Sequence, residues 1–243
     1  MRRVVDFFIA LYLWPVHLSK RLALYIKGKI LTHDEHYLIA LDVIKRKFPS
    51  STGLVIDIGA YDADSTIYFA KRLPGNKVLG FEPNPGPYRQ ALLNSAKYTN
   101  IELFNLGFSD SIGEVDFQVS TNLVSSSLFR IVDNDEIEFE KKIRVKVSTL
   151  DSFMANYPEI LLIKLDVQGA ELNILKAGRE TMKKTRLVLT EVLNTEMYAG
   201  GCLYFEVDAL LRENGFKIYS LITNYNNEGV KYFDILYLNK KLL

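Results

Sequence analysis

The sequence of 243 residues contains one cysteine, and it has no apolar run of the roughly 20 residues that a membrane-spanning helix needs. The lone Cys202 excludes an internal disulfide and disfavours a structural zinc site, because such sites use several thiolate or imidazole ligands. An excess of one sign of charge is also lacking, since 30 basic and 29 acidic residues leave a net charge of +1. The chain as a whole therefore lacks the electrostatic footprint of a nucleic-acid-binding protein.

Apolar residues, by contrast, are plentiful. Hydrophobic residues make up 48% and charged residues 24% of the chain, as in an ordinary soluble domain. This composition excludes a disordered, collagenous or coiled-coil chain, and it is sufficient for a sizeable core. The length predicts one large domain, alone or with a small N-terminal addition.

The first 30 residues differ from the rest of the chain. They carry six basic groups and one acidic group, a net charge of +5, which leaves −4 for the remaining residues. Residues 4–18 are almost continuously apolar but too short to span a membrane. Arg2 and Arg3 resemble the start of a signal peptide, yet no small-residue cleavage site follows. Two alternatives stay open: a helix at a membrane surface, or a helix packed on the core or on a second subunit.

A second N-terminal helix is predicted from Thr32, which forms a capping box with Glu35; Pro49 ends it. His33 and His36 are three residues apart and could share a metal ion, but no third ligand is evident, so we interpret them as exposed residues of a helix start. We expect residues 1–50 to form a helical extension and residues 51–243 the main domain.

From residue 53 onward, short apolar strands alternate with helical stretches, which predicts an α/β fold with a mostly parallel sheet covered on both faces. The predicted strands are 54–58, 77–81, 101–106, 160–165, 186–191, 216–221 and 232–238, and the predicted helices are 65–73, 87–97, 170–177 and 205–213. A polar loop without a helix joins the last two strands, so we expect them to be antiparallel. Residues 109–151 predict a β-hairpin-like insertion with strands at 114–119 and 143–147.

In such a sheet, ligands bind at the carboxyl ends of the strands. The loop after the first strand carries three acids, Asp57, Asp62 and Asp64, and Gly59 allows it to turn tightly. The loop matches neither the GxGxxG pattern nor a P-loop. Its negative charge disfavours a phosphate and favours a cationic ligand.

The second strand ends at Glu82, 25 residues after Asp57, where an acid can accept hydrogen bonds from ribose hydroxyls. The turn formed by Pro83, Asn84 and Pro85 restricts the direction of this carboxylate. A ligand with a ribose, positive charge and no phosphate is indicated, and S-adenosylmethionine fits that description.

Two further carboxylates, Asp166 and Glu191, end two later strands that we expect to be adjacent. They could act as a base and its orienting partner on a substrate hydroxyl, or hold a divalent metal ion, which we do not favour. Asp166 is the first candidate for the base and Glu191 the second. Helix capping or contact with the cofactor's ammonium group are the alternatives for each.

The motifs VIDIGAYDAD, GFEPNP, NLGFSD, SSSL, VSTLD and IKLDVQGAE follow one another from residue 55 to residue 171. Together they resemble the FkbM-type methyltransferases. The resemblance implies a Rossmann-like, seven-stranded class I methyltransferase sheet with an antiparallel final strand. It also implies S-adenosylmethionine as cofactor, S-adenosylhomocysteine as product, and O-methylation of a sugar, glycan or natural-product hydroxyl.

The resemblance also implies roles for individual residues. The residues that it places at the cofactor's methionine, ribose or adenine parts are Asp57, Gly59, Ala60, Tyr61, Asp62, Glu82, Pro83, Asn84, Gly107 and Asp110. Three positions depart from the family pattern: Gln168 stands where glutamate is common, and Tyr61 and Ala63 stand where asparagine and glycine are frequent. We also expect Tyr198, Tyr204 and the loop 224–227 to lie where a sugar could bind.

Other functions remain to be weighed. A short-chain dehydrogenase is disfavoured because no Tyr-x-x-x-Lys pair lies beside the central strands. A nucleic-acid methyltransferase is disfavoured by the charge of −4 on residues 31–243. The alternative from another class is a non-catalytic methyltransferase-like module docked at a membrane. We expect a cytoplasmic protein, and peripheral membrane contact through residues 1–30 and a homo-oligomer both stay open.

Overall fold

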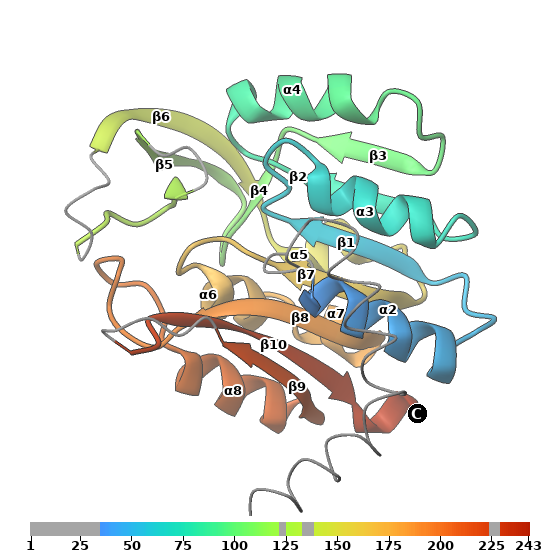
Figure 1. Cartoon of the computed structure of the whole chain (residues 1–243). Helices are drawn as coiled ribbons and strands as arrows, with labels where there is room; N and C mark the ends of the chain where they lie inside the picture. The colour runs from blue at the N-terminus through green and yellow to red at the C-terminus, as the bar shows by residue number, and fades with distance from the viewer. Residues whose placement is uncertain (1–34, 122–124, 133–138, 224–228) are drawn as a thin grey trace, which may run out of the picture. The chain divides into compact units, whose positions relative to one another are not determined.

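The computed structural model describes residues 35–121, 125–132, 139–223 and 229–243 (Figure 1). The apolar segment 4–18, the Thr32 cap, His33 and the loop 224–227 lie outside these described residues. Residues His36–Leu243 form one compact unit. Within the described ranges, no helix is long and apolar enough to cross a membrane.

Seven strands form the main sheet, in the order β3-β2-β1-β7-β8-β10-β9. Their bounds are β1 Leu54–Ile58, β2 Val78–Phe81, β3 Ile101–Phe104, β7 Ile160–Leu165, β8 Thr185–Leu193, β9 Phe216–Thr223 and β10 Tyr232–Asn239. The first five in sheet order run parallel to one another, whereas β10 is antiparallel to both β8 and β9. The predicted mostly parallel sheet with an antiparallel final strand is confirmed. The strand order reverses between β1 and β7, which marks the point where ligands bind in such sheets.

Helices cover both faces of this sheet (Figure 1). They are α2 Glu35–Lys47, α3 Asp64–Arg72, α4 Pro85–Ser95, α5 Leu150–Met154, α6 Glu171–Lys176, α7 Arg179–Lys183 and α8 Tyr204–Glu213. Apolar residues of α2 and α3 share one core cluster with one sheet face. Residues of α5, α6, α7 and α8 share another with the opposite face. The inner strands β1, β2 and β7 therefore bury side chains on both of their sides, as their continuous apolar runs require. The edge strands β3 and β9 are partly exposed.

Helix α2 belongs to the described core. Its buried residues Ala40, Val43 and Ile44 contact the cluster that contains Val55 of β1 and Leu189 of β8. The apolar spacing that predicted a helix before Pro49 thus also gives the face that packs on the sheet. The domain boundary near residue 50 stays a prediction.

The stretch between β3 and β7 forms a second, smaller sheet. It contains β4 Gly107–Phe108, β5 Gly113–Ser120 and β6 Phe139–Ser148, in the order β4-β6-β5. Strands β5 and β6 pair antiparallel and include the strands predicted at 114–119 and 143–147. Alternating residues such as Phe117 and Val145 form the small apolar cluster of this sheet.

Candidate active site

Five ionisable side chains lie on one face of the main sheet near its carboxyl edge. We call them the ionic row: Asp57, Lys164, Asp166, Glu191 and Asp234. The strand register pairs the first with the second and the fourth with the fifth. Asp57, Lys164, Glu191 and Asp234 each lie two positions from a strand residue of the apolar cluster under α2 and α3, and alternation therefore places these four on that same face. Asp166 follows the end of β7, and its Oδ2 lies 3.4 Å from the Lys164 ammonium.

A buried ion pair anchors the row. The Asp57 side chain is fully buried, and its Oδ2 accepts hydrogen bonds of 2.6 Å from the hydroxyls of Ser65 and Thr66. Its Oδ1 lies 3.3 Å from the ammonium of Lys164, as an ion pair without the direction of a good hydrogen bond. Two hydroxyls and one ammonium of the protein thus surround the Asp57 carboxylate, beneath the loop that follows β1. Its predicted place beside the cofactor's methionine part stays a prediction.

Lys164 lies between Asp57 and Asp166. Its ammonium also donates to the Gly59 carbonyl at 3.3 Å and lies 3.4 Å from Asp166 Oδ2. Burial opposes the charge on Lys164, but the carboxylates of Asp57 and Asp166 outweigh burial and hold the pKa of Lys164 well above its usual value. Lys164 is therefore a buried cation that neutralises part of the ionic row.

The loop after β1 approaches the loop after β7 closely. Gly59 has a φ of +82°, and a Cβ at this position would stand 1.9 Å from the carbonyl oxygen of Asp166. Only glycine fits there. Tyr61 and Ala63 also have positive φ values, 50° and 71°, so the two departures from the family pattern keep a left-handed backbone. Ala60 is buried, and its N–H donates to the Phe81 carbonyl at 2.9 Å.

Glu82 joins this loop to the end of β2. Its carboxylate accepts from the N–H of Tyr61 at 3.0 Å and from the N–H of Asn84 at 2.7 Å. Burial raises the pKa of Glu82 to about 7, against the effect of those two donors. Asn84 in turn accepts from the Gly86 N–H and caps α4. The direction that the Pro-Asn-Pro turn suggested for Glu82 is thus fixed by backbone donors on both sides.

The other predicted cofactor residues lie around this turn. A Cβ on Gly107 would stand 3.2 Å from the Pro83 side chain, so β4 passes close beside the residue that follows Glu82. Asp110 is exposed and accepts from the Ser109 hydroxyl at 3.2 Å. Asp62 accepts from the Asp64 N–H, and partial burial raises its pKa. The structure therefore gathers one acidic loop and one turn at the strand ends.

Asp166 and Glu191 lie together, joined by a side chain between them. The amide Nε2 of Gln168 donates to Asp166 Oδ1 at 2.8 Å and to Glu191 Oε1 at 3.0 Å. Burial, followed by the charges of Asp166 and Asp234, raises the pKa of Glu191 well above its usual value. The Asp166 side chain is 36% exposed, so a substrate could reach it, and Glu191 is itself only partly buried.

Some residues of the site were not found from the sequence. Lys164 and Asp234 lie inside strands, and only the pairing register shows that they face Asp57 and Glu191. Burial and the charge of Asp166 raise the pKa of Asp234 to about 7. His36 Nδ1 lies 3.5 Å from Asp234 Oδ2. Tyr37 of α2 also belongs to the site. Burial raises the pKa of Tyr37, and the charge of Lys164 acts in the opposite direction.

The prediction of an exposed His36 is wrong, because its side chain, in the first turn of α2, is only 12% exposed. That helix packs onto the sheet and carries His36 to Asp234, a contact across 198 positions that no local pattern indicates. Among the described residues, no three histidine, cysteine or acidic side chains are placed to hold a metal ion.

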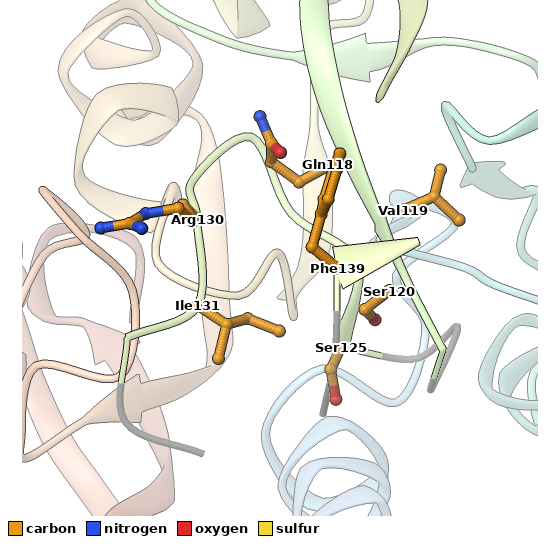
Figure 2. A pocket seen from close by; sticks show the side chains of 7 residues that line it. All are labelled: Gln118, Val119, Ser120, Ser125, Arg130, Ile131 and Phe139. Carbon is orange, nitrogen blue, oxygen red and sulfur yellow. The ribbon is translucent and has the colours of Figure 1, made fainter. Parts of the chain in front are cut away.

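A small cavity lies in the insertion (Figure 2). It is lined by Gln118, Val119 and Ser120 of β5 with Ser125, Arg130, Ile131 and Phe139, and its volume is about 40 Å³. A cavity of that size holds a water molecule and is far smaller than the several hundred Å³ typical of a cofactor site. None of the predicted site residues lines it.

The order of motifs along the chain matches a known family. Residues 57–218, more than half of the chain, match the model of the methyltransferase FkbM domain. The chain belongs to this family. The FkbM match begins at Asp57 of the ionic row and ends in β9, so it includes Glu82, Asp166 and Glu191. The family is the one that the motifs implied, and the seven-stranded sheet is the one expected for it. S-adenosylmethionine as its cofactor stays a prediction.

Curated relatives share the FkbM region at modest identity. The 2-O-methyltransferase NoeI of Sinorhizobium fredii is 28% identical over 160 residues, which cover 60% of this chain and 66% of NoeI. Methyltransferase sdnD of Sordaria araneosa is 27% identical over 232 residues, 83% of this chain and 85% of sdnD. The hexuronic acid methyltransferase AglP of Haloferax volcanii is 26% identical over 152 residues, 58% of this chain and 60% of AglP. The chain thus spans less than two thirds of the length of NoeI and AglP.

Solved methyltransferase structures, some with S-adenosyl-L-methionine or S-adenosyl-homocysteine bound, also resemble the chain. Their identity is 10–15% and their TM-scores are 0.45–0.49, over 77–92% of this chain and 67–96% of those chains.

Proposed function

We propose that this FkbM-family protein is an S-adenosylmethionine-dependent O-methyltransferase that acts on a hydroxyl of a sugar or glycan. The observation that carries the proposal is the pair of carboxylates at Asp166 and Glu191, on the same sheet edge as the loop that Glu82 holds. The names of two relatives, a 2-O-methyltransferase and a hexuronic acid methyltransferase, support a sugar hydroxyl as acceptor.

The residues at the strand ends fit the cofactor. Gly59 leaves room where a side chain would strike the Asp166 backbone, and Glu82 keeps lone pairs for the two ribose hydroxyls beyond its bonds to Tyr61 and Asn84. Asp62 adds negative charge, which suits a sulfonium and an ammonium group. Gly107 and Asp110 would lie by the adenine.

In the proposed reaction, bound S-adenosylmethionine would supply the methyl group of its sulfonium, and the electron pair of the broken carbon–sulfur bond would stay on the sulfur of S-adenosylhomocysteine. Asp166 takes the proton of the acceptor hydroxyl as that oxygen bonds to the methyl carbon. Lys164 and Gln168 hold the two oxygens of Asp166. Burial, followed by the charge of Asp166, raises the pKa of Glu191 and so favours a proton on the Glu191 side of the pair. The chain's main contribution is to align the reacting oxygen with the methyl group.

A panel of methyl glycosides tests the proposal. Hexosides, N-acetylhexosaminides and hexuronides are incubated with S-adenosylmethionine, and mass spectrometry follows O-methylated product and S-adenosylhomocysteine together. We expect at least one sugar class to be methylated on oxygen. Well-folded protein that binds S-adenosylhomocysteine but methylates no sugar would contradict the sugar acceptor. Protein that binds no S-adenosylhomocysteine would contradict the methyltransferase activity and favour a non-catalytic module.

A further inference from the structure

Gln168 has every polar group of its side chain in use. Its Nε2 donates to Asp166 at 2.8 Å and to Glu191 at 3.0 Å, and its Oε1 accepts from the Tyr198 hydroxyl. One amide therefore connects the end of β7, the strand β8 and the loop before α8. The nitrogen can serve two carboxylates only because the oxygen faces a hydroxyl donor, which fixes the orientation of the amide.

The backbone at Gln168 is held as firmly as its side chain. Its φ is +56°, and Gly169 follows at +99°; a non-glycine residue adopts the left-handed region at a cost in free energy. Ser127 of the insertion donates to the Gln168 carbonyl at 2.7 Å. Glu171 accepts from the N–H groups on both sides, at Val167 and Gly169. Ser127 of the insertion and Glu171 of α6 therefore keep the backbone at Gln168 in an unfavourable conformation, which indicates that its position matters.

The charges around the amide explain what it does. The titratable groups that face the pair come from β7 (Lys164), α6 (Glu171), β10 (Tyr232, Asp234), the loop before α8 (Tyr198) and α2 (His36, Tyr37). Four of the titratable groups in this region are carboxyl groups, at Asp166, Glu171, Glu191 and Asp234. A neutral amide gives two donors to the pair without adding charge. An ionised glutamate at this position would give none and would add a fifth carboxylate.

We propose that Gln168 is a positioning residue whose amide holds the carboxylates of Asp166 and Glu191 together as one proton-accepting pair. The inference rests on the function proposed above, in which this pair receives the hydroxyl proton. Gln168 acts through these two carboxylates and does not itself receive the proton. Its amide places two N–H donors between two acids, where a cation could also hold them together. Among the described residues, no three side chains are placed to hold a metal ion here.

A swap of the two residues tests the pairing without any acceptor. Gln168→Glu puts a carboxylate where the amide stood, and Gln168→Glu with Glu191→Gln restores one amide and one carboxylate with their places exchanged. The control is Gln90→Glu, the same chemical change on the exposed face of α4. Melting temperatures are measured from pH 5 to pH 8.

We expect Gln168→Glu to melt near the parent at pH 5 and about 4 °C or more below it at pH 8, because the new carboxyl group ionises among the others. The exchanged pair should recover most of that loss, and Gln90→Glu should show no pH-dependent difference. An equal loss at every pH, or no recovery in the exchanged pair, would show that Gln168 only fills space. If Gln168→Glu does not fold, Gln168→Met with and without Glu191→Gln gives the same comparison.

Turnover separates this inference from the proposed function. For an acceptor found in the glycoside panel, the acid limb of the rate profile of Gln168→Met should move by at least about half a pH unit, because the two carboxylates then repel without a shared donor. Binding of S-adenosylhomocysteine should be unchanged. An unshifted profile in an active enzyme overturns the positioning role and leaves the function standing. Coupled melting without methylation of any acceptor supports the pairing and contradicts the function.

Discussion

At the scale of single residues, Glu82 carries most of the predicted recognition of the cofactor. Its two oxygens are each held by one backbone N–H, so a ribose hydroxyl would meet a carboxylate that is already oriented. We expect Glu82→Ala to weaken S-adenosylhomocysteine binding at least about tenfold in calorimetric titration, which is about 1.4 kcal/mol. Glu114→Ala, an exposed acid on β5, is the control. Equal affinity of the parent and Glu82→Ala would contradict a ribose contact.

The pKa of Glu82 gives this binding a pH dependence. Because burial raises that pKa to about 7, the carboxylate that accepts from the ribose is lost as the pH falls through 7. Affinity for S-adenosylhomocysteine should therefore fall between pH 8 and pH 6 in the parent protein. Glu82→Gln should remove that dependence. A flat profile for the parent would mean that Glu82 does not accept from the ligand.

Asp166 is the other residue whose role can be isolated. Asp166→Asn keeps the size of the side chain but removes the proton acceptor, and general-base contributions are typically about 10²–10⁴-fold in rate. We expect a loss of that order in turnover, with S-adenosylhomocysteine affinity within about threefold of the parent, or about 0.65 kcal/mol. Asp116→Asn on the exposed face of β5 is the matched control. Unchanged turnover in Asp166→Asn would move the base to another group.

At the scale of elements, the strands were the easiest to predict. The runs before Asp57, Glu82 and Asp166 are short and apolar, and each leads directly into an acid. Both the strand and the candidate site residue therefore follow from the local pattern. Helices α5 and α7 were missed because five residues are too few to show a helical period.

The contacts between distant elements were beyond the sequence. Asp234 faces Glu191 through the antiparallel register of β10 and β8, and His36 reaches Asp234 because α2 packs on that sheet face. Pairing register and helix docking are set by tertiary packing, which a single sequence does not display. The Ser-Ser-Ser-Leu motif is similar: its Ser127 contacts Gln168 across 41 positions.

Strand β10 also presents an aromatic ring at the edge of the site. Tyr232 lies two positions from Asp234 on the same side of the strand, and the charges of Glu191 and Asp234, after burial, raise its pKa. Its side chain is 37% exposed, and an aromatic face beside acids suits a sugar ring. We expect Tyr232→Ala to raise the acceptor KM several-fold with little change in kcat. Tyr219→Ala on β9, with the same exposed fraction, should leave both constants unchanged; similar constants for the two variants would exclude a sugar contact at Tyr232.

At the scale of the whole molecule, the buried carboxyl groups of the site lower the free energy of unfolding, and the apolar core offsets that loss. Burial raises the pKa of Glu82, Glu171 and Asp234 to about 7, and that of Glu191 well above its usual value. A carboxyl group whose pKa is higher in the folded state binds more protons when folded, so its effect on the free energy of unfolding becomes less favourable as the pH rises from about 4.5 through 7. For a shift from 4.5 to about 7, the cost is on the order of 3 kcal/mol per group at pH 8.

The molecule should therefore be less stable at pH 8 than at pH 5, and removing one of these charges should flatten the dependence. We expect Asp234→Asn to raise the melting temperature at pH 8 by several degrees and to change it little at pH 5, because the parent carboxyl group is mostly protonated at pH 5. The same change at the exposed Asp116 should have no such effect. A gain of equal size at both pH values would mean that packing rather than charge limits stability at Asp234. A loss at pH 8 would mean that the contact with His36 outweighs the burial of the carboxylate.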